Sequence, residues 1–175
     1  MGMAATSVLD PMVELYKYTG DKKYLDFCYY ILRAWEQENG PKVISALLAT
    51  GNVAKVGNGK TYEMISNFVG LANMYRLTGE KKLLDPLLIA WKDIVANRLY
   101  ITGTASAHEY FQEAGHLPAG VEASMGEGCV TTTWLQFNHQ LYLITGENKY
   151  LEQIENTVYN HLIGAENPQT GCVSY

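Results

Sequence analysis

The chain has 175 residues, enough for one domain with a sizeable core, and its 47% hydrophobic residues are too many for a disordered chain. The net charge is −5 and the 13 lysines and arginines are scattered, which argues against a nucleic-acid partner. No apolar run approaches the roughly 20 residues that span a bilayer, so we expect no membrane partner. Three distant cysteines argue against a disulfide framework.

Three stretches of the chain are variants of one phrase, in which a helix runs into Thr-Gly and an acidic residue follows. They are residues 15–25, 74–84 and 141–151. The glycine supplies the left-handed residue that ends a helix, and the acidic residue suits the positive end of the next helix dipole. A recurring helix-turn-helix unit predicts a helical repeat or toroid. The unequal spacing of the copies favours hairpins with loops of variable length.

Apolar positions at helical spacing predict the remaining elements. In chain order we expect a first hairpin over residues 4–18 and 21–37, a short helix over 42–50, a glycine-containing loop over 51–60, a second hairpin over 62–78 and 80–97, and a third over 129–145 and 147–163. From residue 164 the chain reads as the start of an extended segment. The predicted fold class is mainly α, built from helical hairpins.

The segment 98–128 interrupts this pattern and is too long for a simple hairpin loop. Tyr100–Thr102 reads as a short strand, and Phe111 and Leu117-Pro118 are residues that disorder does not favour. We therefore predict an ordered, partly extended functional loop between the second and third hairpins.

Two polar clusters in this loop could carry chemistry: His108-Glu109-Tyr110 and Glu127-Gly128-Cys129. A glutamate and a cysteine two apart can face one ion if the glycine lets the backbone bend, and zinc accepts both ligands. Each residue also has a plainer interpretation. Cys129 can be a small buried side chain, Glu127 a first-turn carboxylate and Glu109 a solvated charge. The residues alone leave these alternatives open.

An ordered set of motifs runs through most of the chain. It comprises Tyr62–Asn67, Gly70-Leu71, Tyr100–Gly103, His108–Phe111, Leu117-Pro118, Glu127–Thr131, Leu141-Tyr142, Thr145-Gly146, Tyr150–Glu155 and Tyr159-Asn160. Taken together, these motifs resemble the catalytic domain of the β-L-arabinofuranosidase family, glycoside hydrolase family 127 and its relatives. The resemblance implies that residues 1–175 form part of an (α/α)6 toroid, with three of its six hairpins.

The resemblance also implies a chemistry: retaining hydrolysis of β-L-arabinofuranosides or related sugars, in which a zinc-bound cysteine thiolate attacks the anomeric carbon. By position, Glu109 matches the general acid/base, and Glu127 and Cys129 match two zinc ligands. His108 and Tyr62 are candidates for substrate binding. Zinc would keep the thiol deprotonated, and a covalent intermediate would divide the displacement into two steps.

One part of the family pattern is missing from this sequence. The family's nucleophile comes from an adjacent cysteine pair further downstream, which also supplies the remaining zinc ligands. We therefore expect a fragment or truncated homologue that is inactive alone and binds zinc weakly. A three-hairpin piece should also expose apolar edges, which predicts self-association.

Two other functions remain open at this point: a non-catalytic module that binds carbohydrate or protein, and a lyase or epimerase on the same toroid. Convergence of Glu109, Glu127 and Cys129 on one pocket would favour the hydrolase. Burial of Cys129 among apolar side chains, with Glu109 in bulk water, would favour the binding module.

Overall fold

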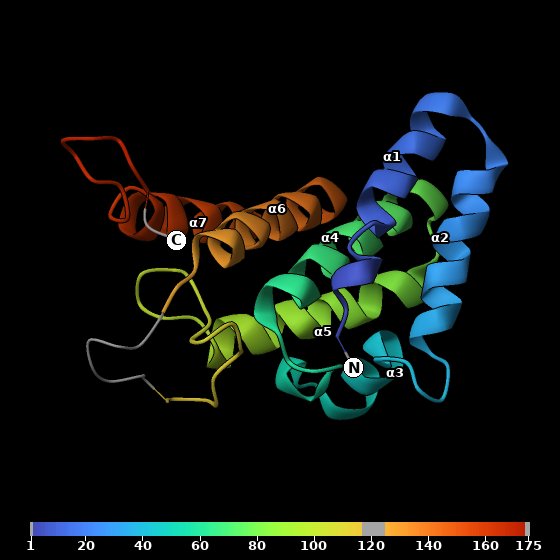
Figure 1. The fold of residues 1–175 in the computed structure, drawn as a ribbon, viewed down its shortest axis with the longest axis horizontal. Coiled ribbons are helices and arrows are strands. Elements are labelled where there is room, and N and C mark those ends of the chain that lie inside the picture. The colour runs from blue at the N-terminus through green and yellow to red at the C-terminus, as the bar shows by residue number, and fades with distance from the viewer. Residues whose placement is uncertain (1, 117–124, 174–175) are drawn as a thin grey trace.

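The structure is a computed structural model that describes residues 2–116 and 125–173. Its α-helices pair in chain order as three hairpins (Figure 1). These are α1 (Leu9–Thr19) with α2 (Lys22–Trp35), α4 (Thr61–Thr78) with α5 (Lys81–Asn97), and α6 (Gly128–Thr145) with α7 (Asn148–Thr157). The short helix α3 (Val43–Thr50) follows the first hairpin, and the π-helical turn η3 (Val158–Leu162) continues α7. Two 3-10 turns, η1 (Ala4–Thr6) and η2 (Val53–Lys55), complete the helical elements of the described residues. The predicted hairpins and short helix are confirmed.

The three Thr-Gly turns share one geometry. The glycines that end the first helices, Gly20, Gly79 and Gly146, have φ of 70°, 71° and 70°. In each turn the threonine hydroxyl accepts the N–H of the following acidic residue, at 3.2, 3.3 and 3.2 Å in chain order. Each acidic side chain also pairs with the lysine two residues later. The repeated phrase is therefore a repeated turn that is built by local hydrogen bonds and ion pairs.

Helix α4 occupies the centre of the assembly, where it packs against α1, α6 and its own partner α5 (Figure 1). Its sequence is apolar around much of its circumference, as a helix with several neighbours requires. Phe68 of α4 meets Phe137 of α6 with ring centroids 5.5 Å apart. On the α1 side, Gly70 permits close approach, because a Cβ there would lie 2.8 Å from the backbone nitrogen of Asp10.

The expected strand at Tyr100–Thr102 is wrong. These residues form a tight turn, in which the Tyr100 N–H donates to the Thr104 carbonyl at 2.8 Å and the Gly103 N–H donates to the Tyr100 carbonyl at 2.9 Å. Gly103, with φ of 84°, reverses the chain too early for a strand to pair with a neighbour. The described residues contain isolated β-bridges rather than strands, and Leu117-Pro118 lies outside the described residues.

The tail closes on itself, since Glu166 and Val173 form an antiparallel bridge. Large apolar side chains are exposed on the first and third hairpins, among them Tyr30 at 58% and Tyr159 at 67%. Self-association through these hairpins stays a prediction. Within the described part of the chain, no helix combines the length and apolarity needed to cross a membrane.

Candidate active site

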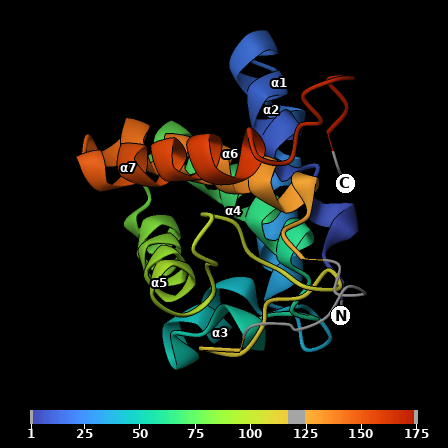
Figure 2. The ribbon, with the colours of Figure 1, turned by 90° about the vertical axis from the view of Figure 1, so that its left-hand side faces the viewer.

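The loop after α5 leads from α5 towards the third hairpin (Figure 2). Hydrogen bonds connect the loop to α6, α7 and η3. The Thr157 hydroxyl donates to the Gly103 carbonyl at 2.6 Å, and the hydroxyls of Thr104 and Thr131 bond at 2.9 Å. The His161 ring nitrogen Nε2 lies 2.8 Å from the Gly126 carbonyl. Both ends of the loop are therefore held by α6, α7 and η3.

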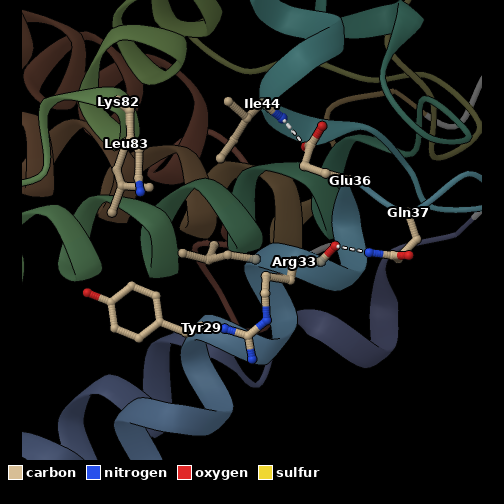
Figure 3. Close-up of a pocket in the computed structure, with 8 residues that line it drawn as sticks. Tyr29, Arg33, Glu36, Gln37, Ile44, Lys82 and Leu83 are labelled. Carbon is tan, nitrogen blue, oxygen red and sulfur yellow. Dashed lines mark hydrogen bonds between the residues drawn. The ribbon is translucent and has the colours of Figure 1, made fainter.

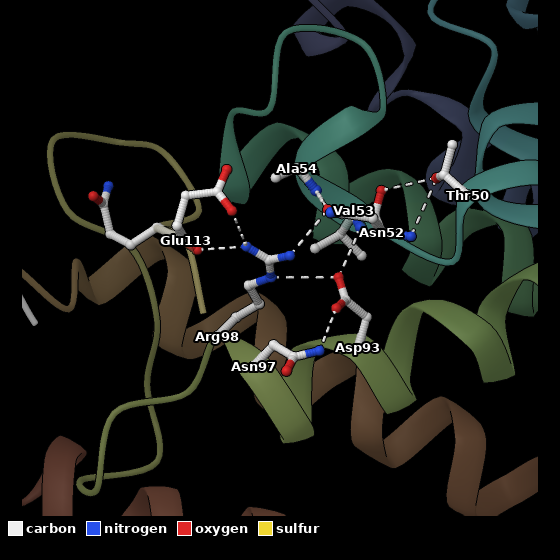
Figure 4. A network of polar contacts seen from close by, with 9 residues as sticks. Thr50, Asn52, Val53, Ala54, Asp93, Asn97, Arg98 and Glu113 are labelled. Atoms are coloured by element: carbon white, nitrogen blue, oxygen red, sulfur yellow. Dashed lines mark hydrogen bonds and ion pairs between the residues drawn. The ribbon is translucent and has the colours of Figure 1, made fainter. Parts of the chain in front are cut away.

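A buried ion pair holds the loop's first residue (Figure 4). Arg98 lies 3.4 Å from the Asp93 carboxylate, and the two side chains are only 3% and 5% exposed. The Arg98 guanidinium also donates to the Gln112 carbonyl at 2.6 Å and to the Asn52 side chain at 3.0 Å. One side chain thereby joins the end of α5, the loop and the segment before η2. Its role is structural, because the network lies apart from the cavity described below.

Glu109 sits in a turn with unusual backbone angles. Ser106, His108 and Glu109 all have positive φ, at 79°, 50° and 73°. A left-handed conformation costs a non-glycine residue about 1–2 kcal/mol, and such strained residues are common at functional sites. Two backbone bonds hold the turn against the start of α4: the Thr61 N–H donates to the Glu109 carbonyl at 2.9 Å, and the Phe111 N–H donates to the Gly59 carbonyl at 3.3 Å.

Glu127 and Cys129 come from the opposite end of the loop. Glu127 is the residue before α6, and its carbonyl accepts the Thr131 N–H at 2.9 Å. Its side chain is buried, with 3% of the residue exposed, and accepts a hydrogen bond from the Ser106 hydroxyl at 3.2 Å. Cys129 is half-buried in the first turn of α6. Ser106 thus links the Glu109 turn to the start of α6.

These elements meet around a small cavity of about 50 Å³, lined by Lys60, Tyr62, Glu63, Glu109, Glu127 and Cys129. Four of the five residues that the sequence suggested are therefore brought together. The fifth, His108, has an exposed side chain and is not among the lining residues. The roles proposed for all five stay predictions.

Lys60 and Glu63 were not predicted from the sequence, although they lie within two residues of Tyr62. Lys60 Nζ lies 2.6 Å from the Glu109 carboxylate, whose side chain is 55% exposed. This hydrogen bond raises the pKa of Lys60 above its usual range. Glu63 accepts the Met3 N–H at 2.7 Å. With three carboxylates and one ammonium, the lining is net negative.

The donor set is only half of what zinc needs. Glu127 and Cys129 supply a carboxylate and a sulfur, both of which zinc accepts, but a structural or catalytic zinc takes three or four protein ligands. Within residues 2–116 and 125–173, no group of three His, Cys, Asp or Glu side chains could hold a metal ion. Glu127 and Cys129 alone therefore do not complete a zinc site.

A larger hollow of about 350 Å³ lies elsewhere, between α2, α3 and the start of α5 (Figure 3). Its lining is mostly apolar and includes Tyr29, Leu32, Ile44 and Leu83. None of the candidate site residues reaches it, and Glu36 on its rim is used to accept the Ile44 N–H at 3.0 Å. The candidate residues therefore line the smaller cavity and not the larger hollow.

Known proteins resemble this chain over most of its length. The family model for the beta-L-arabinofuranosidase GH127 catalytic domain matches residues 5–175. The non-reducing end beta-L-arabinofuranosidase of Bifidobacterium longum subsp. longum is 25% identical over 181 aligned positions, which cover 85% of this chain and 26% of that protein.

Solved structures show the same architecture. A GH127 beta-arabinofuranosidase superposes with a TM-score of 0.79 at 26% identity, over 96% of this chain and 27% of that one. A GH127 beta-L-arabinofuranosidase from Geobacillus stearothermophilus T6 has a TM-score of 0.73 at 18% identity, over 91% and 28% of the two chains. The present chain thus spans about a quarter of the length of these relatives. Its three hairpins correspond to part of the (α/α)6 toroid of these enzymes. The chain belongs to the GH127 β-L-arabinofuranosidase family and contains part of its catalytic domain.

Proposed function

We propose that this chain forms part of the active site of a retaining glycoside hydrolase that acts on β-L-arabinofuranosides or closely related sugars. The observation that carries the proposal is the cavity shared by Glu109, Glu127 and Cys129. These residues reach it from the two ends of a long loop, and the strained turn at Glu109 is held in place by backbone hydrogen bonds. The family to which the chain belongs supports the reaction class.

In this proposal Glu109 is the general acid and base. It donates a proton to the oxygen of the leaving group in the first step and removes a proton from water in the second. In the structure Glu109 is paired with Lys60, which suits the carboxylate that serves as base. Proton donation requires Glu109 to be protonated, so the pair with Lys60 must loosen when a glycoside enters.

Glu127 and Cys129 are proposed as two ligands of a zinc ion. Zinc, when bound, would keep a cysteine sulfur in its thiolate form. The chain's own contribution is to fix the two donors: Glu127 is oriented by Ser106, and Cys129 is fixed by the first turn of α6. The remaining ligands and the nucleophile would come from residues beyond those two.

The test uses the polypeptide encoded by the whole open reading frame in which this sequence lies, since the relatives are longer than the chain. With an aryl β-L-arabinofuranoside as substrate, whose phenol leaves readily, Glu109→Gln should lower kcat by about 100- to 10,000-fold, because the second step loses its general base. Azide should restore turnover and give an arabinosyl azide of retained configuration, because azide needs no general base. Glu38→Gln, a change in an exposed glutamate away from the cavity, is the matched control.

Two results would contradict the proposal. One is full activity of Glu109→Gln with azide having no effect. The other is a wild-type polypeptide that binds the arabinofuranoside without hydrolysing it, which would indicate the non-catalytic carbohydrate-binding module instead.

A further inference from the structure

We propose that Lys60 is a positioning residue for Glu109: its ammonium group holds the Glu109 carboxylate at the mouth of the cavity. The consequence for turnover rests on the proposed function, whereas the positioning itself does not. No motif of the sequence suggested Lys60 as part of the site.

The backbone and the side chain of Glu109 are held by different groups. Its carbonyl is fixed by the Thr61 N–H, and Tyr110 next to it forms a β-bridge with Lys60. The carboxylate has one hydrogen-bond partner within the described residues, Lys60 Nζ at 2.6 Å. Fixing the backbone does not fix a glutamate side chain, which has several rotatable bonds. Lys60 therefore determines where this carboxylate lies.

The surroundings keep Lys60 charged and in place. Glu63 and Tyr62 face the cavity from α4, and Glu127 and Cys129 face it from the start of α6. Lys60 is the cation of this lining, and its side chain is 28% exposed. Its ammonium also lies 6.0 Å from the centre of the Tyr110 ring, within range of a cation–π contact.

A charged neighbour suits a residue whose charge changes twice during a reaction. When Glu109 passes its proton to the leaving oxygen, it becomes an anion, and the ammonium of Lys60 is there to bond it. When Glu109 later takes a proton from water, the bond weakens again and Lys60 keeps its own proton. The proton passes through Glu109 alone, so Lys60 orients the acid/base without entering the proton balance.

The competing interpretation is an ordinary surface ion pair, because many such pairs do little. The 55% exposure of Glu109 is consistent with that view. The two interpretations differ in one measurable property. If the pair positions Glu109, removing the lysine makes the Glu109 side chain more mobile. If it is an ordinary surface pair, removing the lysine leaves that mobility unchanged.

Side-chain NMR relaxation of the chain with ¹³C-labelled glutamate tests this directly, with the Glu109 signal assigned from its loss in Glu109→Gln. Lys60→Met should lower the order of the Glu109 side chain, and Lys60→Arg, which keeps a donor and the charge, should preserve it. Lys55→Met removes a lysine charge outside the cavity and should leave Glu109 as it is in the wild type. Unchanged order of Glu109 in Lys60→Met would overturn the proposal.

Turnover of the aryl arabinofuranoside gives the second readout, again in the polypeptide from the whole open reading frame. Because small misplacement of a catalytic group can cost on the order of 100-fold, Lys60→Met should lower kcat by about that factor with little change in KM. Lys60→Arg should recover most of the loss. An arginine variant as slow as the methionine variant would count against positioning. If the wild type is inactive, the proposed function fails while the relaxation experiment still decides the role of Lys60.

Discussion

The three Thr-Gly turns and the loop before α6 both join one helix to the next, but they do so with opposite kinds of contact. The turns use neighbours in sequence: a threonine, a glycine and an acidic residue, with nothing within 4 Å of where a Cβ on Gly20, Gly79 or Gly146 would lie. The loop uses distant partners, including Asn52, Thr157 and His161. At Gly126, a Cβ would lie 2.7 Å from both the His161 ring and the Thr104 methyl.

The hairpins with their turns form the scaffold, and the loop before α6 carries part of the candidate site. Local turns can be repeated without regard to the rest of the molecule, so they supply hairpins of similar geometry. The loop can hold Glu109 in a strained turn only because contacts from the second and third hairpins stabilise it. Changes in the loop should therefore be costlier than similar changes in the turns.

The largest expected effect comes from breaking the buried pair at the start of the loop. Arg98→Met leaves the Asp93 carboxylate buried without its cation, although the Val53 N–H still donates to it at 2.8 Å. Removing one partner of a buried ion pair costs about 3–5 kcal/mol. Urea unfolding, monitored by circular dichroism, should show that the free energy of unfolding falls by this amount.

The control is an ion pair on the scaffold. Lys22 and Asp26 lie 3.0 Å apart on α2 with side chains 79% and 61% exposed, so Lys22→Met should change stability by less than about 1 kcal/mol. Equal losses in the two variants would show that the loop has no special anchor at Arg98.

Two glycines with similar backbone angles, one in the loop and one in a turn, allow a matched test. Gly126 in the loop and Gly146 in the third turn have nearly the same φ, 67° and 70°. Alanine at Gly146 should cost only the backbone strain, about 1–2 kcal/mol. Alanine at Gly126 should add an overpacking cost of about 1–3 kcal/mol, because its methyl meets His161 and Thr104.

Chemical denaturation of both variants measures the difference. Gly126→Ser and Gly146→Ser provide a second matched pair with the same backbone strain. Equal losses of unfolding free energy at the two positions would mean that the loop accommodates the added side chain as readily as the turn does.

The same division explains what the sequence could predict. The hairpins were readable because apolar spacing and the Thr-Gly phrase act over a few residues. The strand expected at Tyr100–Thr102 was wrong because Gly103 closes a turn there that brings its carbonyl to Thr157, a partner 54 residues away. Lys60 was missed for a related reason: it precedes α4, far in sequence from the Glu109 that it contacts.

A smaller effect concerns the second turn, whose acidic residue also makes a long-range hydrogen bond. Tyr29 of α2 donates its hydroxyl to Glu80, so the acidic residue of the second turn also joins the first hairpin to the second. This bond, with burial as a further cause, raises the pKa of Tyr29 to about 12. Tyr29→Phe should cost about 1 kcal/mol at neutral pH.

The pH dependence of that loss identifies its source. Because the folded pKa of Tyr29 lies above the ordinary value of 10, its contribution is fully present below pH 10 and disappears as the pH rises through about 12. The stability difference between wild type and Tyr29→Phe should therefore be constant from pH 7 to 9.5 and shrink above pH 10, as measured by urea unfolding at each pH. Tyr30→Phe, on the exposed side of the same helix, is the control and should show no such trend. A difference that persists unchanged above pH 12 would assign the loss to packing, and the Tyr29–Glu80 hydrogen bond would then contribute nothing to the stability of the second turn.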